Sequence, residues 1–202
     1  MTRGDGQHRL GPFRDPKVDA AVLASTRRLL IERGYRDTSV DAIAEAAGVS
    51  RPTVYRRWPS KAHVVYDAAF PADASRIEPS GDAVTELKTL IRNVIGWLGD
   101  PAAAAALPGL IVDMRSDPAL QTSLGERHSA VFSADLRELF ARNSDVLRPL
   151  DPDTVLDMIV GAAMQALSIR NVTDLDAYAA SLTDVLLRGV LAGDPEATFM
   201  TG

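Results

Sequence analysis

Basic and aromatic side chains gather in one short stretch of this sequence. Residues 50–62, SRPTVYRRWPSKA, place three arginines and a lysine around a threonine, a tyrosine and a tryptophan. An arginine can donate two hydrogen bonds to the acceptors on a guanine edge, and a threonine methyl can contact the methyl of thymine. Tyrosine and the remaining basic groups are common donors to backbone phosphates. The chemistry that this stretch offers is hydrogen bonding to a nucleic acid.

Two short helices joined by a tight turn would hold these side chains in place. Thr38 with Asp41 forms a capping-box signature ahead of a first helix over residues 40–47. Gly48 suits the left-handed turn that follows, because a side chain would resist that conformation. Ala44 is small where the second helix must approach the first closely. The spacing therefore predicts a helix-turn-helix.

The second helix of this motif carries most of the basic residues. Ser50 is expected to cap it, Pro52 lies in its first turn, and Trp58 ends it because it precedes Pro59. When such a motif binds DNA, the second helix enters the major groove and reads base edges from its N-terminal part. We predict that the ring of Trp58 closes the core of this small unit and does not stack on a base.

Lys61 stands in the first turn of a further helix, predicted from Ser60 to about Ala69. A cation there lies against the positive end of the helix dipole, which is unfavourable. A phosphate bound at this point would be attracted both by the lysine and by the free N–H groups of the helix. The alternative is a lysine that is only solvated, and the neighbouring basic residues favour the phosphate.

The run GYRDTSVDAIAEAAGVSRPTVYRRWPSKAHVV resembles the N-terminal DNA-binding domain of the TetR family of bacterial transcriptional regulators, and the match covers about residues 16–66. The resemblance implies an all-helical fold in which three helices bind DNA. It also implies a C-terminal helical domain that binds a ligand and dimerises through its last two long helices. Asp41 lies near DNA by this resemblance, although an acid there would repel phosphate. The DNA-binding residues expected from the motif and the resemblance are Val40, Arg51, Pro52, Thr53, Tyr55, Arg56, Arg57 and Lys61.

The rest of the chain is predicted to be helical, because its apolar residues recur at helical spacing and no segment alternates as a strand would. Beyond about residue 70 the resemblance is one of architecture only. Gly34 is placed to end the first long helix. After the motif we expect helices at 82–98, 102–116 with an interruption at Pro108–Gly109, 118–143, 154–169 and 175–191.

We therefore predict an all-α fold of about nine helices. The expected divisions are a flexible basic arm over 1–14, a helix-turn-helix DNA-binding domain over 15–59, a C-terminal regulatory and dimerisation domain over 60–193 with its first helix, 60–70, as connector, and a tail over 194–202.

Charge is divided unevenly along the chain. Residues 1–70 hold 12 Lys and Arg against 8 Asp and Glu, whereas the remaining residues hold 10 against 19. This asymmetry suggests a small basic module that meets a polyanion and a larger acidic body, although chance variation would explain it almost as well. The sequence has no cysteine and its three histidines are scattered, so we expect no disulfide and no metal site. Without a signal-like N-terminus or a long apolar run, we expect a cytoplasmic, nucleoid-associated bacterial protein with no membrane partner.

Two apolar helices near the C-terminus suggest a homodimer. One helix-turn-helix reads few base pairs, whereas two copies related by a twofold axis read a palindrome in double-stranded DNA. The alternative is that the apolar faces only fill the core of the monomer. The residues expected at the dimer interface are Val155, Ile159, Ala162, Ala163, Ala166, Leu182, Val185 and Leu186.

Large, adaptable side chains in the acidic half are candidates for a ligand pocket, although any one of them would serve equally in an ordinary core. The candidates are Trp97, Leu110, Met114, Phe132, Leu136, Phe140, Met158 and Met164. Together these features predict a regulator, and within that class a repressor that a small-molecule ligand of unknown identity releases from its operator.

Two other classes of function were weighed against a regulator. One is an enzyme, and the other is a helical interaction protein that keeps the helix-turn-helix only as a scaffold. The sequence has no nucleophile elbow, phosphate-binding loop or metal-binding helix pair, so we expect no catalytic residue and no cofactor. The basic residues of 50–62 are intact, which argues against a mere scaffold.

Overall fold

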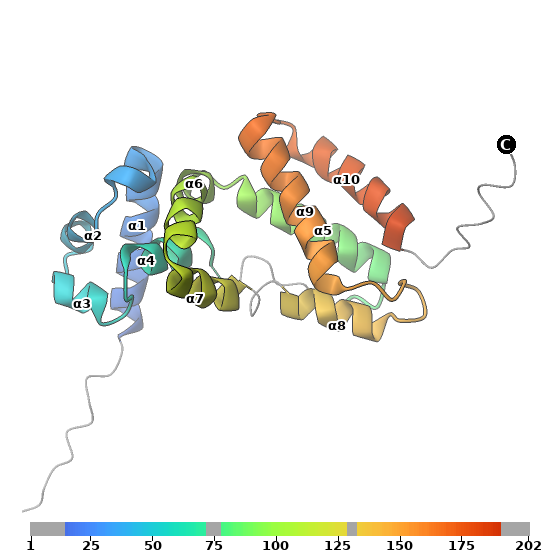
Figure 1. Ribbon diagram of the computed structural model, residues 1–202, viewed down its shortest axis with the longest axis horizontal. Helices are drawn as coiled ribbons and strands as arrows, with labels where there is room; N and C mark the ends of the chain where they lie inside the picture. The colour runs from blue at the N-terminus through green and yellow to red at the C-terminus, as the bar shows by residue number, and fades with distance from the viewer. Residues whose placement is uncertain (1–14, 72–77, 129–132, 191–202) are drawn as a thin grey trace, which may run out of the picture.

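The computed structural model of the chain describes residues 15–71, 78–128 and 133–190, and within these ranges the chain is helical with no β-strand (Figure 1). The predicted arm, the predicted tail and Phe132 lie outside the described residues. The described residues form ten α-helices and one π-helical turn: α1 Pro16–Asp37, α2 Val40–Ala46, α3 Arg51–Tyr55, α4 Lys61–Ala69, α5 Ala83–Leu98, α6 Pro101–Ser116, α7 Pro118–His128, α8 Ala134–Arg142, α9 Pro152–Met164, η2 Gln165–Ile169 and α10 Leu175–Val190. The predicted all-α class is confirmed.

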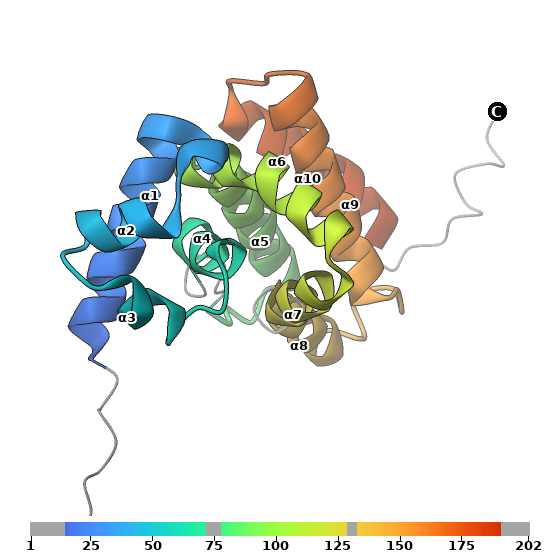
Figure 2. The ribbon, with the colours of Figure 1, turned by 60° about the vertical axis from the view of Figure 1, so that its left-hand side comes forward.

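Helices α1, α2 and α3 form a unit at one end of the molecule, and α4 leads from it into the larger body (Figures 1 and 2). Trp58 is only 1% exposed in the core of this unit, which confirms its predicted place. Gly48 has a φ of +66°, so the left-handed turn between α2 and α3 is also present as predicted. We call this core the helix-turn-helix core; its buried residues are Val22, Leu29, Val40, Ile43, Ala44, Val54, Trp58 and Val64.

The start of α2 differs from the prediction by one residue. Ser39, not Thr38, is the N-cap, because its Oγ accepts a hydrogen bond from the backbone N–H of Ala42 at 3.1 Å. The Thr38 side chain is fully buried and donates to the carbonyl oxygen of Gly34 at 2.8 Å. The predicted capping box was therefore wrong, because Thr38 stabilises the end of α1 instead. Gly34 kinks α1 with a φ of +75°, and the helix then runs on to Asp37.

The larger body is built around α5, which packs against α9 and α10 (Figure 1). The side chains of Leu87 and Ile91 on α5 are fully buried there. Phe70, at the end of α4, lies against Trp97 of α5 with ring centroids 4.5 Å apart. We call this second cluster of buried apolar side chains the body core.

No described helix is by itself both long and apolar enough to cross a membrane; α5 and α6 meet that test only when taken together, and they are bent by 77° at their junction.

Helix α4 contributes to both cores. Val64 packs in the helix-turn-helix core, whereas Ala62, Val65, Tyr66 and Ala69 pack in the body core. Successive residues of a helix point about 100° apart, so neighbouring side chains on α4 face different cores. Nearly every residue of α4 is buried. The helix therefore joins the two parts of the chain through packed side chains as well as through the backbone.

Helix α6 runs through Pro108 and Gly109 without the interruption that the sequence predicted. A proline inside a helix removes one backbone hydrogen bond, which costs stability. Packing on α1 offsets that loss, because Gly109 lies directly against the ring of Tyr35. A Cβ at Gly109 would come within 2.1 Å of a ring carbon. The Tyr35 hydroxyl donates to Asp113 on the same helix, so this one tyrosine joins α1 to α6 at two points.

The segment 118–143, predicted as one long helix, is described as two helices, α7 and α8. Helix α7 packs against α6, whereas α8 packs against α9, so the two parts serve different neighbours. Residues 129–132, across which the predicted single helix would continue, lie outside the described residues.

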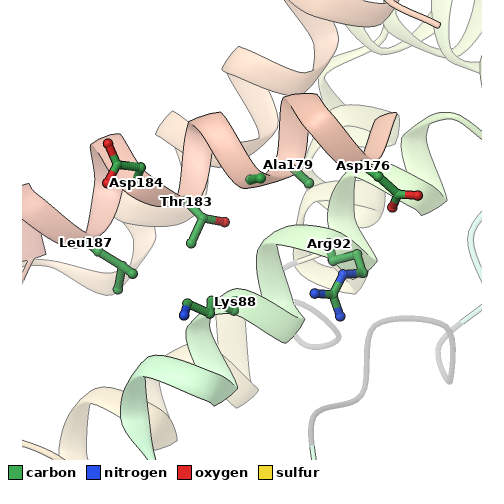
Figure 3. A pocket seen from close by; sticks show the side chains of 8 residues that line it. Lys88, Arg92, Asp176, Ala179, Thr183, Asp184 and Leu187 are labelled. Carbon is green, nitrogen blue, oxygen red and sulfur yellow. The ribbon is translucent and has the colours of Figure 1, made fainter. Parts of the chain in front are cut away.

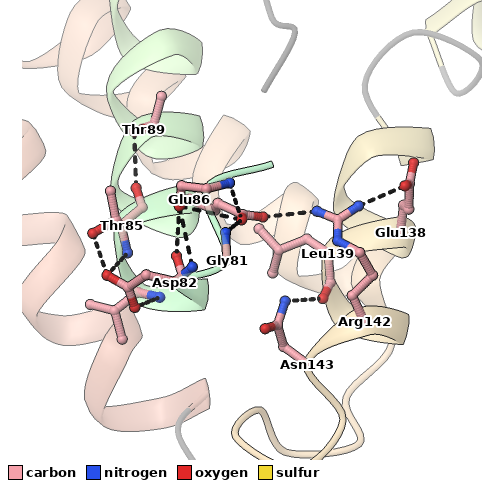
Figure 4. Close-up of polar contacts among 11 residues, drawn as sticks. Gly81, Asp82, Thr85, Glu86, Thr89, Glu138, Leu139, Arg142 and Asn143 are labelled. Carbon is pink, nitrogen blue, oxygen red and sulfur yellow. Dashed lines mark hydrogen bonds and ion pairs between the residues drawn. The ribbon is translucent and has the colours of Figure 1, made fainter. Parts of the chain in front are cut away.

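A buried carboxylate fastens α8 to the start of α5 (Figure 4). The Glu86 side chain is 1% exposed and accepts hydrogen bonds from Arg142 at 2.8 Å and from the backbone N–H groups of Ser80 and Gly81 at 2.7 and 3.0 Å. Burial by itself would raise the pKa of Glu86, but these hydrogen bonds outweigh it and hold the pKa below its ordinary value. The carboxylate is thus charged at neutral pH and orders the turn that precedes α5.

Candidate nucleic-acid interface

The surface of α3 presents a group of exposed basic and aromatic side chains. Arg51, Pro52, Tyr55 and Arg56 are exposed, and Tyr55 is 41% exposed although it is a large ring. Val54 is the one fully buried residue of this helix, and it fixes α3 on the helix-turn-helix core. Because Val54 points inward, the opposite side of α3 faces away from the protein. We call the exposed side chains of Arg51, Tyr55 and Arg56 the α3 surface.

Arg51 is held between two neighbours. Its Nε lies 3.2 Å from Oδ1 of Asp41 on α2, and its guanidinium lies 5.5 Å from the centre of the Tyr55 ring. Hydrogen bonding to Tyr55 and the charge of Asp41 both raise the pKa of Arg51. The guanidinium is therefore a permanent cation with a defined position. The sequence placed Asp41 near DNA, where its charge would repel a phosphate. In the structure its partner is Arg51.

Thr53 and Arg56 are linked within α3. The Arg56 guanidinium donates to Oγ1 of Thr53 at 3.1 Å, and the hydroxyls of Thr53 and Ser50 lie 2.8 Å apart. Ser50 makes no capping bond to the backbone; its side chain bonds Thr53 instead. These contacts order the first turn of a helix that is only five residues long.

Two other predicted DNA-binding side chains are engaged within the protein. Arg57 is partly buried, and its Nε lies 2.5 Å from Oδ1 of Asp19 on α1. Val40 is 7% exposed and belongs to the helix-turn-helix core. Arg57 thus fastens the end of α3 to α1, and Val40 offers DNA no free side chain. The role of Asp19 has no signal in the sequence, because 38 residues separate it from Arg57.

The Lys61 ammonium is directed toward the end of α1. It donates to the carbonyl oxygens of Tyr35 and Arg36 at 2.6 and 3.3 Å, and it lies 4.1 Å from the centre of the Tyr35 ring. Burial lowers the pKa of Lys61, an effect that the nearby acids Asp113 and Asp37 oppose. In this arrangement Lys61 satisfies carbonyl groups that the end of a helix leaves free, and so joins α4 to α1.

The predicted ligand-binding residues are divided between core and surface. Leu110, Leu136, Phe140 and Trp97 are buried in the body core, Met114 and Met164 pack at its edge, and Met158 is 55% exposed. Trp97 alone among them lines a hollow of about 480 Å³ between α1, α4 and α5, together with Leu23, Arg27 and Asn93. The described candidates are therefore spread from the body core to the surface, and Met158 lies on an outer face of α9.

A second hollow, of about 560 Å³, lies between α5 and α10 (Figure 3). Lys88 and Arg92 line it from α5, and Asp176, Thr183 and Asp184 line it from α10. None of the predicted ligand-binding residues within the described ranges lines this hollow. Its wall combines cationic groups on one helix with acidic groups on the other.

The predicted dimer residues mostly face inward. Val155, Ile159, Ala163 and Leu186 are at most 4% exposed, because the faces of α9 and α10 that carry them cover α5. Ala166, in η2, is also fully buried. Ala162 and Leu182 are partly buried, and Val185 is 63% exposed. Of the predicted set, only Val185 stands fully on a free face. Two further large apolar groups are uncovered nearby, Met158 on α9 and Ile169 at the end of η2, which are 55% and 73% exposed.

Comparison with known proteins points to one family for both parts of the chain. Residues 22–67 match the profile described as bacterial regulatory proteins, tetR family, and residues 77–186 match the tetracyclin repressor-like C-terminal domain. The transcriptional regulator YdeS of Bacillus subtilis is 26% identical over 195 residues, which cover 92% of this chain and 96% of that protein. The repressor TetR of Mycobacteroides abscessus is 35% identical over 114 residues, 55% of this chain and 59% of that protein.

A solved structure shows the same fold. NalD of Pseudomonas aeruginosa, described as the secondary repressor of the MexAB-OprM multidrug efflux pump, superposes with a TM-score of 0.60 at 23% identity. The superposition covers 87% of this chain and 98% of NalD. The helical arrangement in Figures 1 and 2 is therefore shared beyond the helix-turn-helix.

Proposed function

Because the chain belongs to the TetR family of bacterial regulatory proteins and is thus a DNA-binding regulator of transcription, we propose that it is a homodimeric repressor of a palindromic operator. A small molecule of unknown identity releases it from that operator. The observation that carries the proposal is the α3 surface, where Arg51, Tyr55 and Arg56 stand exposed on a helix fixed by Val54. Similarity to the Mycobacteroides abscessus protein, a DNA-binding transcriptional repressor, supports repression in particular.

In this proposal the residues predicted to bind DNA divide into two groups. Arg51, Pro52, Tyr55 and Arg56 contact DNA directly, with Thr53 at the edge of the contact. Arg57 and Lys61 act through position, because they hold α3 and α4 on α1. The presence of two cores supports a division of the chain into a DNA-binding domain over 15–59 and a regulatory domain over 60–193, although Val64 and Leu30 each pack in the core of the other part.

The first test is binding to DNA from the region upstream of the protein's own gene. We expect the protein to retard this fragment in a gel and to remain bound when random DNA is added in excess. Affinity should fall steeply as salt rises, since phosphate contacts release counterions. Equal affinity for the fragment and for random DNA would contradict a sequence-specific regulator. Compounds that release the retained fragment would then identify the class of ligand.

The second test concerns the dimer. Val185 is exposed on α10 and Met158 on α9. These two helices lie in the body, at the end of the molecule away from α1–α3 (Figure 1). We expect Val185→Asp to raise the dimer dissociation constant by about a hundredfold, because a carboxylate would be buried there without a partner. Analytical ultracentrifugation measures this constant directly.

The matched control for the dimer test is Val112→Asp. Val112 is 62% exposed on α6, outside the proposed interface, so its substitution should leave the dissociation constant unchanged. If both variants dimerise as the wild type does, the α9–α10 face is not the interface.

A further inference from the structure

An acidic side chain stands on the surface that is proposed to face DNA. Asp41, in the first turn of α2, contacts Arg51 of α3 through both carboxylate oxygens, Oδ1 to Nε at 3.2 Å and Oδ2 to NH1 at 3.4 Å. The two side chains come from different helices and remain 66% and 58% exposed. The pair therefore lies at the outer surface of the motif, beside Tyr55.

Folding does not account for this pair. Exposed ion pairs contribute little to stability, because water screens them and two long side chains must be ordered. On a DNA-binding surface a carboxylate also repels phosphates and so weakens the sequence-independent part of binding. An acid in the first turn of α2 stabilises the helix modestly through its dipole, but any acid there would do so. The contact with Arg51 and the cost for affinity therefore call for a further role.

The geometry of Arg51 suggests that benefit. Asp41 accepts from one side of the guanidinium, and the group carries further N–H donors at its other end. Tyr55 flanks the same guanidinium at 5.5 Å, so its position is constrained from two directions before DNA arrives. An arginine fixed in this way presents a fork of donors that matches the two acceptors on guanine. It also loses less side-chain freedom on binding.

We propose that Asp41 is a specificity-determining positioning residue. It directs Arg51 toward a base edge and keeps it from contacting a phosphate instead. Where the base is guanine, Arg51 bonds the base while still paired with Asp41. Where the base is not guanine, Arg51 finds no matching pair of acceptors. The repulsion between the Asp41 carboxylate and the DNA phosphates is then not offset by a base contact. Asp41 thus lowers affinity for random DNA more than affinity for the operator. This inference rests on the proposed function, because it requires a sequence-specific DNA complex.

The test compares Asp41→Asn with the wild type on operator and on random DNA, each over a range of salt concentrations. Asparagine keeps the shape of the side chain and removes its charge. We expect the ratio of operator affinity to random-DNA affinity to fall about tenfold, the order of discrimination that one bidentate base contact provides. Random DNA should bind more tightly to the variant, and the operator should not. Binding to an operator library with each base pair varied should show the loss of preference at one position per half-site.

Two further variants make the result specific. Arg51→Ala should lose preference at the same base pair, and adding Asp41→Asn to it should cause no further loss there. Glu45→Gln removes one exposed negative charge from the next turn of the same helix, beside a hollow that Arg28 and Arg33 of α1 also line, and should leave the base preference intact.

Several outcomes would overturn the proposal. One is an equal gain in affinity for operator and random DNA with Asp41→Asn, which would make Asp41 only a repelling charge. Another is no change in either affinity, which would make it only a helix-terminal acid. Loss of preference at a base pair that Arg51→Ala does not affect would also contradict it. If the wild type binds operator and random DNA equally well, the proposed function fails. If the wild type prefers the operator and Asp41→Asn keeps the same preference, only this inference fails.

Discussion

Replacing Trp58 with alanine is expected to lower the free energy of unfolding of the helix-turn-helix unit by about 3–5 kcal/mol, the usual cost of removing a fully buried aromatic side chain. Trp58 is 1% exposed and shares its core with Val54 of α3 and Ile43 of α2. Its Nε1 also donates to Oδ2 of Asp67 on α4 at 2.8 Å. Because this core is small, no other side chain of similar size is available to fill the space.

The loss of stability should appear first as local unfolding of α2 and α3, before the whole chain unfolds. Amide hydrogen exchange in α2 and α3 should accelerate strongly in Trp58→Ala, and operator affinity should fall with it, since α3 would no longer be held in place. Trp58→Phe is the control, because it keeps an aromatic ring in the core while it removes the bond to Asp67 and a smaller part of the buried volume. Unchanged exchange in α2 and α3 of the alanine variant would show that Trp58 does not support this unit.

A methyl group at Gly109 should be nearly as damaging. In Gly109→Ala the new Cβ would lie 2.1, 2.4 and 2.7 Å from three carbons of the Tyr35 ring. The ring cannot turn aside freely, because its hydroxyl bonds Asp113 and the Lys61 ammonium lies over its face. We expect a loss of roughly 3 kcal/mol, at the upper end of the range for overpacking, measured by urea denaturation.

Gly125→Ala provides the matched control for this prediction. Gly125 lies within α7, and a Cβ there would meet no atom within 4 Å. Since alanine favours helix over glycine by about 1 kcal/mol, this control should be neutral or stabilising. The double variant Tyr35→Ala with Gly109→Ala should be more stable than the sum of the two single losses predicts. Additive losses would mean that the ring is not what Gly109 accommodates.

The helix-turn-helix was predictable from the sequence because its signals are local. Gly48 at the left-handed turn, the proline at Pro59 and the inward residue Val54 each act within a few positions along the chain. Their spacing fixed the elements of this region to within a few residues. Thr38 was misassigned because it stands beside a serine, and either side chain suits a helix start. Ser50 has the predicted N-cap position, but its hydroxyl bonds Thr53 and not the backbone.

The contacts that orient the site could not be predicted from the sequence, because they join helices that lie far apart along the chain. Asp19 reaches Arg57 from α1, and Tyr35 receives Lys61 from α4. A surface acid and a tyrosine give no sign of their partners until the helices are packed. The same limit applied to α9 and α10, where an apolar face facing the core and one facing a partner have the same spacing, so burial alone separates Val155 from Val185.

Helix α4, whose neighbouring residues Val64 and Val65 are buried in different cores, bears on how such regulators can be recombined. A hybrid that joins this DNA-reading unit to a foreign sensor has no neutral cut point within α4. A junction placed before the helix would put a residue of the foreign protein in place of Val64 in the helix-turn-helix core. A junction placed after it would leave the foreign sensor packed against Val65, Tyr66 and Ala69 of this chain in place of its own residues. A workable splice must therefore alternate residue by residue along α4, each parent supplying the side chains that its own interior was built around.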